Sequence, residues 1–542
     1  MSETRKPWLK HYPGDIQTEI EIPDITLPQL IKQSVERFPD HEALSFYGMT
    51  MSYKELALQI VRMASAFQQA GVQKGDRVAI MLPNCPQYVI SYFATLEVGA
   101  IVTQVNPMYV ERELETLLND SGAETIVIYD AVYPIFKKIQ AKTPVKHAIV
   151  VSLKPGDPSF EPAQSFEAFL ATGNDEVREP KMDSADDVAV LQYTGGTTGR
   201  SKGAMLTHRN LVANVLQAAE YFKQNTEFGK ERILTVLPLF HVFGMTTCMN
   251  YGLYLGAKLL LLPRFELDEV LKTIKAEQPT YFPGVPTMYV AIANHPEAEK
   301  YNIESIRTCN SGGSAMPVEV MKKYEAKTGA QVLEGYGLSE TSPVTHVNPG
   351  FGERKPGSIG IPVPSTDYKI VDIETGKKEV PAGEEGEIII RGPQVMKGYW
   401  NMPEESEKAL RDGWLYTGDI ARMDEDGYAY IVDRKKDLII ASGYNIYPRE
   451  IEEVLYLHPD VVEAAVVGVA DPYRGETVKA VVVLKDGKTA ESQDLISHCQ
   501  KYLAAYKVPK LVEFWEELPK STVGKILRRA VREKSVSNGS GS

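Results

Sequence analysis

Residues 52–71 carry the clearest alternation of apolar and polar positions in the chain. Ser52 and Glu55 form a capping box, and Gly71 supplies a stop signal. Between them, apolar side chains recur at helical spacing, namely Leu56, Ile60, Met63 and Phe67. This pattern predicts one amphipathic helix.

The next segments alternate between apolar runs and helical patterns. Residues 77–82 are typical of a buried strand, residues 86–99 of a helix and residues 101–105 of another strand. Strand-helix-strand units of this kind build parallel sheets, and similar alternation continues to about Leu153. We therefore expect a first α/β layer in this part of the chain.

A second α/β layer is expected after the polar, proline-rich stretch at residues 154–187. Its pattern predicts a helix from Asn210, strands over 233–237 and 258–262, and a helix over 267–278. The two layers follow the same order of elements, although no short sequence repeat links them.

The pattern changes toward the C-terminus. Residues 357–432 show short strands with frequent turns, which predicts a β-rich subdomain. Further along, a helix from Pro448, two apolar strands and two helices are expected, the strands over 464–469 and 479–484 and the helices near Ser492 and Ile526. The second pattern is typical of a small α+β domain.

A domain boundary is expected at residues 433–437, where five polar residues interrupt two apolar runs. The N-terminal domain would span 1–433, with its β-rich part at about 357–433, and a small mobile domain would span 434–534. Residues 535–542 are Ser, Gly, Asn and Val only, so we expect a flexible tail there.

Composition narrows the classes of function. The chain has 542 residues, enough for several cores, and its net charge of −13 disfavours binding to nucleic acid. The four cysteines are far apart and form no zinc-like cluster, so they are expected to be reduced and mostly buried; they are Cys85, Cys248, Cys309 and Cys499. The polar start and the lack of a membrane-spanning apolar run predict a cytoplasmic protein.

The most informative segment is residues 194–203, which read Thr-Gly-Gly-Thr-Thr-Gly-Arg-Ser-Lys-Gly. An apolar strand over 188–191 precedes it, and a helix is expected to follow. Its glycines permit close backbone approach, its hydroxyl and amide groups can donate to phosphate oxygens, and Arg200 and Lys202 add positive charge. The segment lacks the Gly-Lys-Ser or Gly-Lys-Thr of a P-loop, so it indicates a different kind of triphosphate site.

Four further segments follow in order, at residues 334–341, 416–419, 433–437 and 519–529. Together with residues 194–203 they resemble the motifs of the adenylate-forming superfamily, which includes acyl- and aryl-CoA synthetases, firefly luciferase and peptide-synthetase adenylation domains. The resemblance covers essentially the whole chain. It implies an α/β fold with a mobile C-terminal domain and an enzyme that uses ATP, Mg²⁺ and coenzyme A.

The resemblance also assigns roles to residues. Lys525 would be the catalytic lysine, Glu340 a catalytic residue that holds magnesium with Thr194, and Lys436 the hinge. The nucleotide would contact Thr194, Gly195, Gly196, Thr197, Thr198, Gly199, Lys202, Gly313, Ser314, Glu334, Gly335, Tyr336, Gly337, Ser339, Asp419 and Arg434. Residues 441–445, with Ser442, Gly443 and Tyr444, resemble the loop that lines the coenzyme A path. Most members have Thr at the position of Ser339, but both residues supply a hydroxyl group.

The implied chemistry has two half-reactions. A carboxylate attacks the α-phosphate of ATP, and Lys525 offsets the repulsion between the two anions. The thiol of coenzyme A then attacks the acyl-adenylate while the C-terminal domain turns about Lys436. The chain has no G-x-S-x-G nucleophile elbow, which argues against a serine hydrolase.

The acid would occupy a pocket built from residues 239–245, 283–289 and 311–314, with contacts from His241, Val242, Met245, Val285 and Gly312. These segments are apolar with small residues interleaved, and each buried methylene contributes roughly 0.8 kcal/mol. Residues 105–109 and 283–289 resemble those of bacterial fatty acid–CoA ligases for medium and long chains. A fatty acid is therefore the expected carboxylic acid.

Three other functions share part of this pattern. An aryl-CoA ligase of the 4-coumarate-CoA ligase type has the same nucleotide motifs and a different pocket. A loader of carrier proteins would use another acceptor, and a non-catalytic nucleotide-binding module would have no use for Lys525. The sequence leaves open both peripheral membrane contact and a homodimer.

Overall fold

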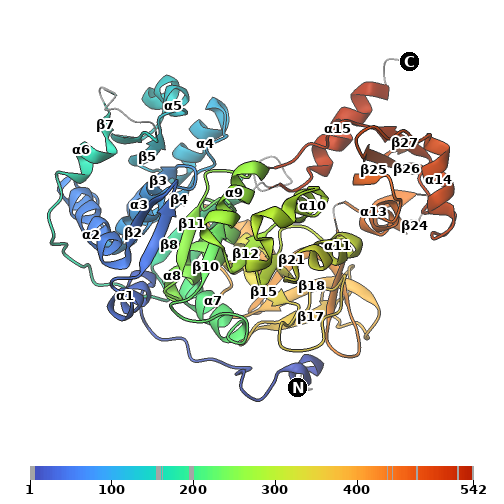
Figure 1. Cartoon of the computed structure of the whole chain (residues 1–542), viewed down its shortest axis with the longest axis horizontal. Helices are drawn as coiled ribbons and strands as arrows, with labels where there is room; N and C mark the ends of the chain where they lie inside the picture. The colour runs from blue at the N-terminus through green and yellow to red at the C-terminus, as the bar shows by residue number, and fades with distance from the viewer. Residues whose placement is uncertain are drawn as a thin grey trace.

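The computed structural model describes residues 6–153, 160, 163–194, 201–435, 437–441, 444–471, 474–521 and 524–539. Figure 1 shows a large α/β part, which holds the N-terminal three quarters of the chain, and a smaller unit in red at its side. The predicted helix over 52–71 is present as α2 (Tyr53–Gln69), and Ser52 and Glu55 form its capping box. The expected mixed α/β class, with a large and a small domain, is confirmed.

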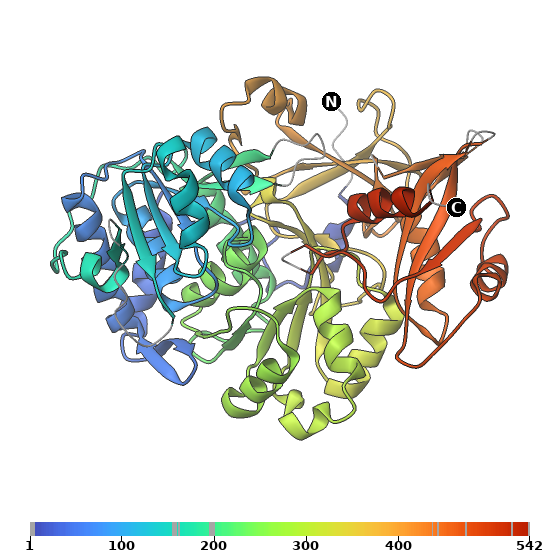
Figure 2. The same cartoon turned by 90° about the horizontal axis from the view of Figure 1, so that it is seen from above.

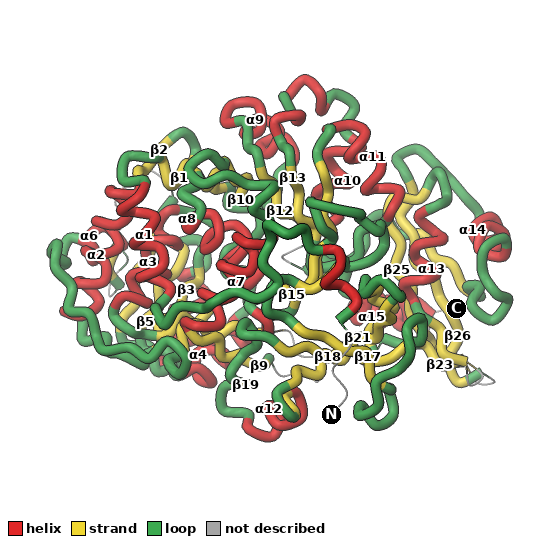
Figure 3. Tube along the Cα trace, turned by 90° about the horizontal axis from the view of Figure 1, so that it is seen from below, coloured by secondary structure: helices red, strands yellow, loops and turns green. Residues whose placement is uncertain are grey.

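The first α/β lobe contains an eight-stranded sheet in the order β19-β9-β8-β4-β3-β5-β6-β7. Its strands are β3 (Arg77–Met81), β4 (Ile101–Gln104), β5 (Thr125–Tyr129), β6 (His147–Val151), β7 (Gln164–Ser165), β8 (Val188–Thr194), β9 (Lys202–Thr207) and β19 (Gly398–Tyr399). Helices α2, α3 (Pro86–Glu97), α4 (Glu111–Ser121), α5 (Tyr133–Ile139), α6 (Phe166–Leu170) and η2 (Gln140–Lys142) belong to this lobe (Figure 3). The predicted strand-helix-strand unit is present as β3, α3 and β4, and β3 pairs with β4 in parallel.

The second lobe contains a nine-stranded sheet in the order β16-β15-β14-β13-β12-β10-β11-β1-β2. Its strands are β1 (Glu42–Phe46), β2 (Met49–Ser52), β10 (Arg232–Thr235), β11 (Lys258–Leu261), β12 (Tyr281–Gly284), β13 (Thr308–Ser311), β14 (Gln331–Gly337), β15 (Val344–Val347) and β16 (Ile361–Pro362). Its helices are α1 (Leu27–Arg37), α7 (His208–Tyr221), η3 (Gly244–Asn250), α8 (Tyr251–Tyr254), α9 (Leu267–Glu277), α10 (Pro286–Asn294), η4 (Ala298–Tyr301), η5 (Ile303–Ser305), α11 (Val318–Thr328) and η6 (Ser339–Thr341). The expected second α/β layer is therefore confirmed.

The structure corrects one expectation about local structure and adds one element. The segment after residue 200 does not enter a helix directly, because β9 comes first and pairs antiparallel with β8, from Thr194 opposite Lys202 to Val188 opposite Thr207. The apolar run from Gly203 to Leu206 supplies the buried side chains of this strand. The polar, proline-rich stretch 154–187, for which no element was predicted, contains α6, whose Phe166 and Phe169 are buried.

The β-rich part is present as predicted. Its sheet joins β17 (Asp367–Val371), β18 (Glu385–Arg391), β21 (Trp414–Met423) and β20 (Leu410–Arg411), and β22 (Ala429–Arg434) pairs with β21. α12 (Pro403–Ala409) lies before β20 in the chain. The N-terminal segment, with η1 (Pro7–His11), reaches this sheet through an ion pair between Lys10 and Asp426 (Figure 1).

The smaller unit has a five-stranded sheet of its own. Its strands are β23 (Ile439–Ala441), β24 (Tyr444–Ile446), β25 (Val461–Asp471), β26 (Gly475–Leu484) and β27 (Leu511–Phe514), and its helices are α13 (Pro448–Tyr456), α14 (Ser492–Gln500) and α15 (Arg528–Gly539). Residues 535–539, which we expected to belong to a flexible tail, are part of α15, which runs to Gly539. Ser535 is buried, and its carbonyl accepts a hydrogen bond from Lys479.

The large α/β part and the smaller unit have separate clusters of buried apolar side chains. One continuous apolar cluster includes Val102 of the first sheet, Ile233 of the second and Ile388 of the β-rich sheet. The smaller unit has separate clusters, one around Val466 and one around Val467. A unit with its own core can move as a body. Figure 2 shows the two lobes and the β-rich part packed together, with this unit in red at the far end from the first lobe.

Two smaller findings concern the whole chain. All four cysteines are free and buried, as expected. Among the described residues, no helix has both the length and the apolar character that crossing a bilayer requires.

Candidate active site

The predicted motifs converge on the carboxyl ends of three parallel strands. In the register of β12, β13 and β14, Gly284 lies opposite Ser311, and Ser311 lies opposite Glu334. The predicted pocket segments and the nucleotide segment at 334–341 therefore leave neighbouring strands at the same edge. In open α/β sheets this edge is where ligands bind.

The ends of the proposed phosphate loop lie on β8 and β9. Thr194 is the last residue of β8 and pairs with Lys202, the first of β9, and the hydroxyl of Ser201 donates to the carbonyl of Thr194 at 2.6 Å. The hairpin thus holds both ends of the loop together. The loop residues Gly195, Gly196, Thr197, Thr198 and Gly199 lie outside the described residues.

Tyr399, which the sequence did not single out, joins two predicted site residues. Its hydroxyl donates to Glu340 Oε1 at 2.8 Å, and the Lys202 ammonium lies 5.1 Å from the centre of its ring. Lys202 also forms an ion pair with Glu405 of α12. Tyr399 reaches this place because β19 adds to the edge of β9, with Tyr399 opposite Ala204. No local motif marks Tyr399, because its partners are nearly 60 and 200 residues away in sequence.

The oxygen donors of this region fit magnesium. η6, which carries Glu340, packs against both β8 and β9, so the carboxylate lies beside the strand that ends at Thr194. Mg²⁺ prefers oxygen ligands and is commonly held by one or two protein groups together with water and substrate phosphates. No group of three or more His, Cys, Asp or Glu side chains with metal-binding geometry occurs among the described residues.

Tyr336, Asp419 and Arg434 form a second predicted group. The Tyr336 hydroxyl donates to Asp419 Oδ2 at 2.5 Å, and Arg434 Nε lies 3.5 Å from Asp419 Oδ1. Asp419 and Arg434 face each other in the register of β21 and β22. The sheet therefore brings together three residues that are far apart in the chain, with a buried carboxylate that can accept hydrogen bonds from hydroxyl groups.

Glu334 carries the most perturbed carboxyl group of the site. It is buried, and burial raises its pKa to about 7, although Arg449 and the amide of Met316 oppose the shift. Met316 N donates to Oε1 at 3.1 Å, and Arg449 of α13 approaches the same oxygen at 3.9 Å. Glu334 Oε2 has no partner within the described protein, so it remains able to accept a hydrogen bond.

The remaining residues of the motif at 334–341 shape the backbone. A side chain at Gly337 would lie 2.1 Å from the carbonyl oxygen of Pro343, and one at Gly335 would lie 3.3 Å from that of His346. Ser339 begins η6 directly before Glu340. The tight packing of β14 against β15 therefore explains why small residues occupy these two positions.

The predicted acid pocket lies on the other side of the carboxyl ends of β12, β13 and β14. A Cβ atom at Gly312 would lie 3.0 Å from the Phe243 ring, and one at Gly313, whose φ is +79°, would lie 3.5 Å from Val285. Ser314 follows at the start of the loop that leads to α11. The glycines thus let the backbone of this loop approach side chains from two other predicted segments.

His241 is half-buried at the expected head of this pocket. Its Nδ1 accepts a hydrogen bond from the Phe243 amide at 3.2 Å, and burial, aided by the nearby charge of Lys525, lowers its pKa to about 4. The imidazole is therefore neutral near pH 7, and its proton is on Nε2. In this form it can donate one hydrogen bond to a substrate oxygen.

The deep part of the predicted pocket is fully buried. Val242 and Met245 have almost no exposed surface, and Met245 is the second residue of the π-helical segment η3. Gln104 Nε2 donates to the Met245 sulfur at 3.3 Å, and the Tyr88 hydroxyl donates to Gln104. The sequence did not single out Gln104 or Tyr88, because both lie in apolar runs of the first lobe.

Lys525 is carried to the site by a short, cross-linked loop of the smaller unit. Ser521 N donates to the Lys525 carbonyl at 2.7 Å, and Leu527 N donates to that of Pro519 at 2.8 Å. The loop tip touches α10, since a Cβ atom at Gly524 would lie 2.8 Å from Thr287 Oγ1. Lys525 therefore reaches the pocket head from a different domain, as its effect on His241 also indicates.

The predicted hinge and coenzyme A loop fall partly outside the described residues, as the phosphate loop does. Lys436, Ser442 and Gly443 lie outside the described residues. The backbone of Tyr444 pairs with Ala441 across β24 and β23, and its side chain is not described.

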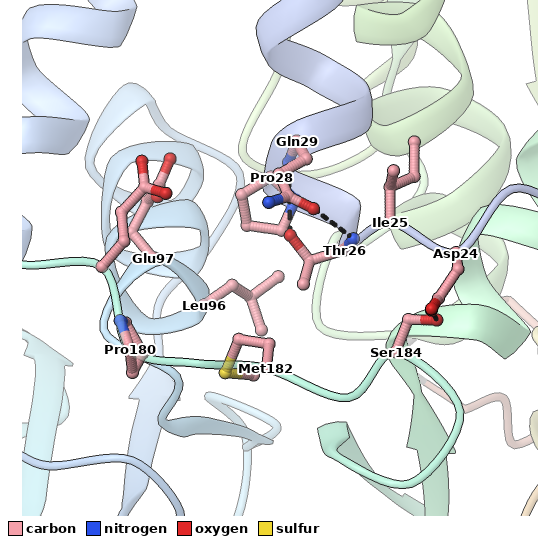
Figure 4. A pocket seen from close by; sticks show the side chains of 11 residues that line it. Asp24, Ile25, Thr26, Pro28, Gln29, Leu96, Glu97, Pro180, Met182 and Ser184 are labelled. Atoms are coloured by element: carbon pink, nitrogen blue, oxygen red, sulfur yellow. Dashed lines mark hydrogen bonds between the residues drawn. The ribbon is translucent and has the colours of Figure 1, made fainter.

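A separate cavity of about 160 Å³ lies far from these strand ends (Figure 4). It is enclosed by the start of α1, the end of α3 and the chain around Pro180 and Met182. The Ser184 hydroxyl donates to Asp24 at 2.6 Å across its rim. None of the predicted site residues lines it.

Two α/β lobes, a β-rich sheet and a smaller domain that delivers a lysine to their shared edge define the architecture of an adenylate-forming enzyme. The chain belongs to the AMP-binding enzyme family. The family described as AMP-binding enzyme matches residues 31–400, and the AMP-binding enzyme C-terminal domain matches residues 450–525.

Three similar proteins illustrate the relationship. A long-chain-fatty-acid–CoA ligase of Bacillus subtilis (strain 168) is 48% identical over 99% of both chains. The solved structure of an anthranilate CoA ligase with anthranoyl-AMP has a TM-score of 0.89 at 27% identity, covering 96% of this chain and 99% of its own. MatB from Rhodopseudomonas palustris, 33% identical and covering 94% and 99%, scores 0.84 with ATP bound and 0.75 in its apo form.

Proposed function

We propose that the protein is an ATP-dependent fatty acid–CoA ligase. It would convert a medium- or long-chain carboxylate and ATP to an acyl-adenylate and pyrophosphate, and then convert the acyl-adenylate and coenzyme A to acyl-CoA and AMP. The observation that carries the proposal is the full-length similarity to a long-chain-fatty-acid–CoA ligase at 48% identity. The buried, apolar surroundings of Val242 and Met245 suit an alkyl chain.

In the first half-reaction a carboxylate oxygen bonds to the α-phosphorus, and the bond between this phosphorus and pyrophosphate breaks. Lys525 would lie beside the carboxylate and the α-phosphate and reduce the repulsion between them. Neutral His241 would donate its Nε2 proton as a hydrogen bond to a carboxylate oxygen and orient the nucleophile. No covalent intermediate with the protein is needed.

The nucleotide would lie along the ends of the strands, from Gly313 past Glu334 to Asp419. The Asp419 carboxylate would accept hydrogen bonds from the ribose hydroxyls, with Arg434 beside it. Glu340, with Thr194, would hold Mg²⁺, which neutralises charge on the phosphates when it is bound. Tyr399 orients Glu340 through its hydroxyl and keeps Lys202 beside the phosphate loop through its ring.

In the second half-reaction the thiol of coenzyme A attacks the acyl carbonyl, and AMP leaves with the electrons of the broken anhydride bond. We propose that the domain over residues 434–534 turns about Lys436 between the two steps, withdraws Lys525 and brings the 441–445 loop to the thiol path. The separate core of this domain supports such a rotation. ATP and coenzyme A are available in the cytoplasm, so we propose a cytoplasmic location, with peripheral membrane contact because the expected substrate is a lipid.

An assay of pyrophosphate release tests the proposal. The enzyme would be given ATP, Mg²⁺ and fatty acids of graded chain length, with and without coenzyme A, and acyl-CoA would be measured in parallel. We expect release with medium or long chains and loss of most activity in Lys525→Ala. Lys520→Ala is the matched control, because Lys520 lies on the same loop but forms an ion pair with Glu463 of its own domain.

Two outcomes would count against the proposal. Equal activity with 4-coumarate and related aryl acids would favour an aryl-CoA ligase. Adenylate formation without transfer to coenzyme A would favour a loader of carrier proteins. Sedimentation of the pure protein would decide whether it forms a homodimer.

A further inference from the structure

One buried carboxylate, that of Asp433, contacts both domains. Asp433 lies near the end of β22 and faces Ile420 of β21 in the register of the β-rich sheet. Its side chain is only 1% exposed. Burial raises its pKa, although Arg528 and two backbone amides oppose the shift. A buried carboxylate of this kind is stable as an anion only while a positive partner stays beside it.

The positive partner of Asp433 comes from the other domain. Arg528 Nη1 donates to Asp433 Oδ1 at 2.8 Å. Arg449, the second residue of α13, donates its backbone amide to Asp433 Oδ2 at 3.1 Å. Two elements of the smaller domain, the starts of α13 and α15, therefore meet on a single side chain of the larger one.

Arg528 moves with the smaller domain. Its Nη2 and Nε donate to Glu452 of α13 at 2.6 and 3.1 Å, and Asp437 lies 3.7 Å from Nη1. Although burial opposes it, the charges of Glu452 and Asp433 raise the pKa of Arg528, so the guanidinium stays charged. Because Glu452 fixes Arg528 within its own domain, a rotation of that domain separates Arg528 from Asp433.

The same pair fixes the catalytic loop. Arg528 is three residues after Lys525 and is the first residue of α15, while the loop before it is cross-linked by the hydrogen bond from Leu527 N to Pro519. Figure 2 shows the dark red segment before α15 reaching the middle of the molecule, over the green lobe. Anchoring Arg528 therefore holds Lys525 at the pocket head.

Arg449 adds a second, weaker link across the same boundary. Its Nη1 donates to the carbonyl of Ile431 at 2.6 Å, and Nη2 approaches Glu334 at 3.9 Å. MatB resembles the present arrangement more closely with ATP bound than in its apo form, by TM-scores of 0.84 and 0.75.

We propose that Asp433 is a positioning residue for the first half-reaction: its ion pair with Arg528 locks the smaller domain with Lys525 in place, and this pair opens before the thiol step. The inference rests on the proposed two-step function. It goes beyond that function by naming the contact that divides the two domain orientations. Loss of the pair should slow adenylate formation and leave thioester formation intact.

The test uses Asp433→Asn in the full-length enzyme and measures the two half-reactions separately. Asparagine keeps the shape and can still accept a hydrogen bond from the Arg449 amide, so mainly the charge is lost. Adenylate formation is followed as pyrophosphate released from ATP, Mg²⁺ and a fatty acid without coenzyme A. Thioester formation is followed from synthetic acyl-adenylate and coenzyme A, with no ATP present.

We expect the first half-reaction to slow by roughly 10- to 100-fold, the factor that the loss of one charged hydrogen bond gives. The second half-reaction should stay within about two-fold of the parent or become faster, and the dissociation constant of ATP should change by less than about two-fold. Arg529→Ala is the matched control, because Arg529 is exposed and, among the described residues, its ion pair is with Glu533 within α15. It should leave both half-reactions unchanged.

Equal losses in the two half-reactions would show a general structural role, and an unchanged first half-reaction would show that the pair positions nothing; either result overturns the proposal. Retained thioester formation demonstrates that the variant is folded. If the parent enzyme releases no pyrophosphate with any fatty acid, the proposed function fails, and that failure is distinct from a failure of the Asp433 variant alone.

Discussion

At Gly524 the catalytic loop meets the larger domain, and we predict that replacing Gly524 by alanine slows the first half-reaction. Its φ is +76°, a conformation that costs an L-residue roughly 1–2 kcal/mol. The added Cβ would lie 2.8 Å from Thr287 Oγ1 and 3.0 Å from Val285 Cγ2. Both distances are shorter than ordinary carbon contacts, so the loop must withdraw by a few tenths of an ångström.

Withdrawal of this loop destabilises the domain orientation in which Lys525 reaches the site, and it does not destabilise the fold. If 1–2 kcal/mol is lost only when Lys525 is seated, the first half-reaction falls roughly 5- to 30-fold. Thioester formation from synthetic acyl-adenylate should be unaffected, because the loop is not seated in that step. The assay is single-turnover pyrophosphate release, with thioester formation measured on the same preparation.

A second substitution separates the two causes of the loss. Thr287→Ala removes the oxygen that the new Cβ would meet, so the double variant should recover the part of the loss due to this contact and keep the part due to φ. A Gly524→Ala enzyme with parental adenylate formation would refute the reasoning, since it would mean that the loop need not approach Thr287. A double variant no faster than Gly524→Ala would refute the role of the contact.

Two further predictions concern side chains around the strand ends. Tyr399→Phe keeps the ring beside Lys202 and removes the hydroxyl that donates to Glu340, so we expect a roughly 10-fold or larger fall in adenylate formation and a higher Mg²⁺ requirement, measured by titrating Mg²⁺ at fixed ATP. An unchanged Mg²⁺ titration would contradict this link. Because burial raises the pKa of Glu334 to about 7, the folded protein holds a proton that the unfolded chain releases at lower pH, and the stability from this group is lost as pH rises through about 7. Glu334→Gln should therefore become more stable relative to the parent between pH 5 and pH 8, as measured by the unfolding midpoint at each pH, and a constant difference would contradict the shift.

The local pattern of the chain was sufficient for most elements. The capping box of α2 and the alternation over β3, α3 and β4 are set by residues close in sequence, and the structure reproduces them within a few residues. The strand β9 was missed because its short apolar run directly precedes the helical pattern of α7, and only its pairing with β8 makes it a strand. The end of the fold at α15 was misplaced because Ser535 is held by Lys479, a contact that composition does not reveal.

The residues of the candidate site also fall into two groups: those that a sequence motif marks, and those that only the fold brings to the site. Glycine-rich segments and the lysine loop have recognisable motifs, so Thr194, Glu340 and Lys525 could be named from the sequence. Tyr399, Glu405 and Asp433 could not, because each matters through a partner brought near by sheet pairing or domain packing. No motif marks Tyr399 or Glu405, and the motif at residues 433–437 assigned no role to Asp433.

In the proposed first half-reaction, a carboxylate oxygen bonds to the α-phosphorus of ATP. The most direct test supplies ATP, Mg²⁺, coenzyme A and a fatty acid whose carboxylate carries oxygen-18, and examines the products by mass spectrometry. Attack by the carboxylate oxygen should place one oxygen-18 atom in AMP for each acyl-CoA formed. Oxygen-18 in inorganic phosphate, with ADP as the nucleotide product, would contradict it, because that result requires an acyl phosphate in place of an acyl-adenylate.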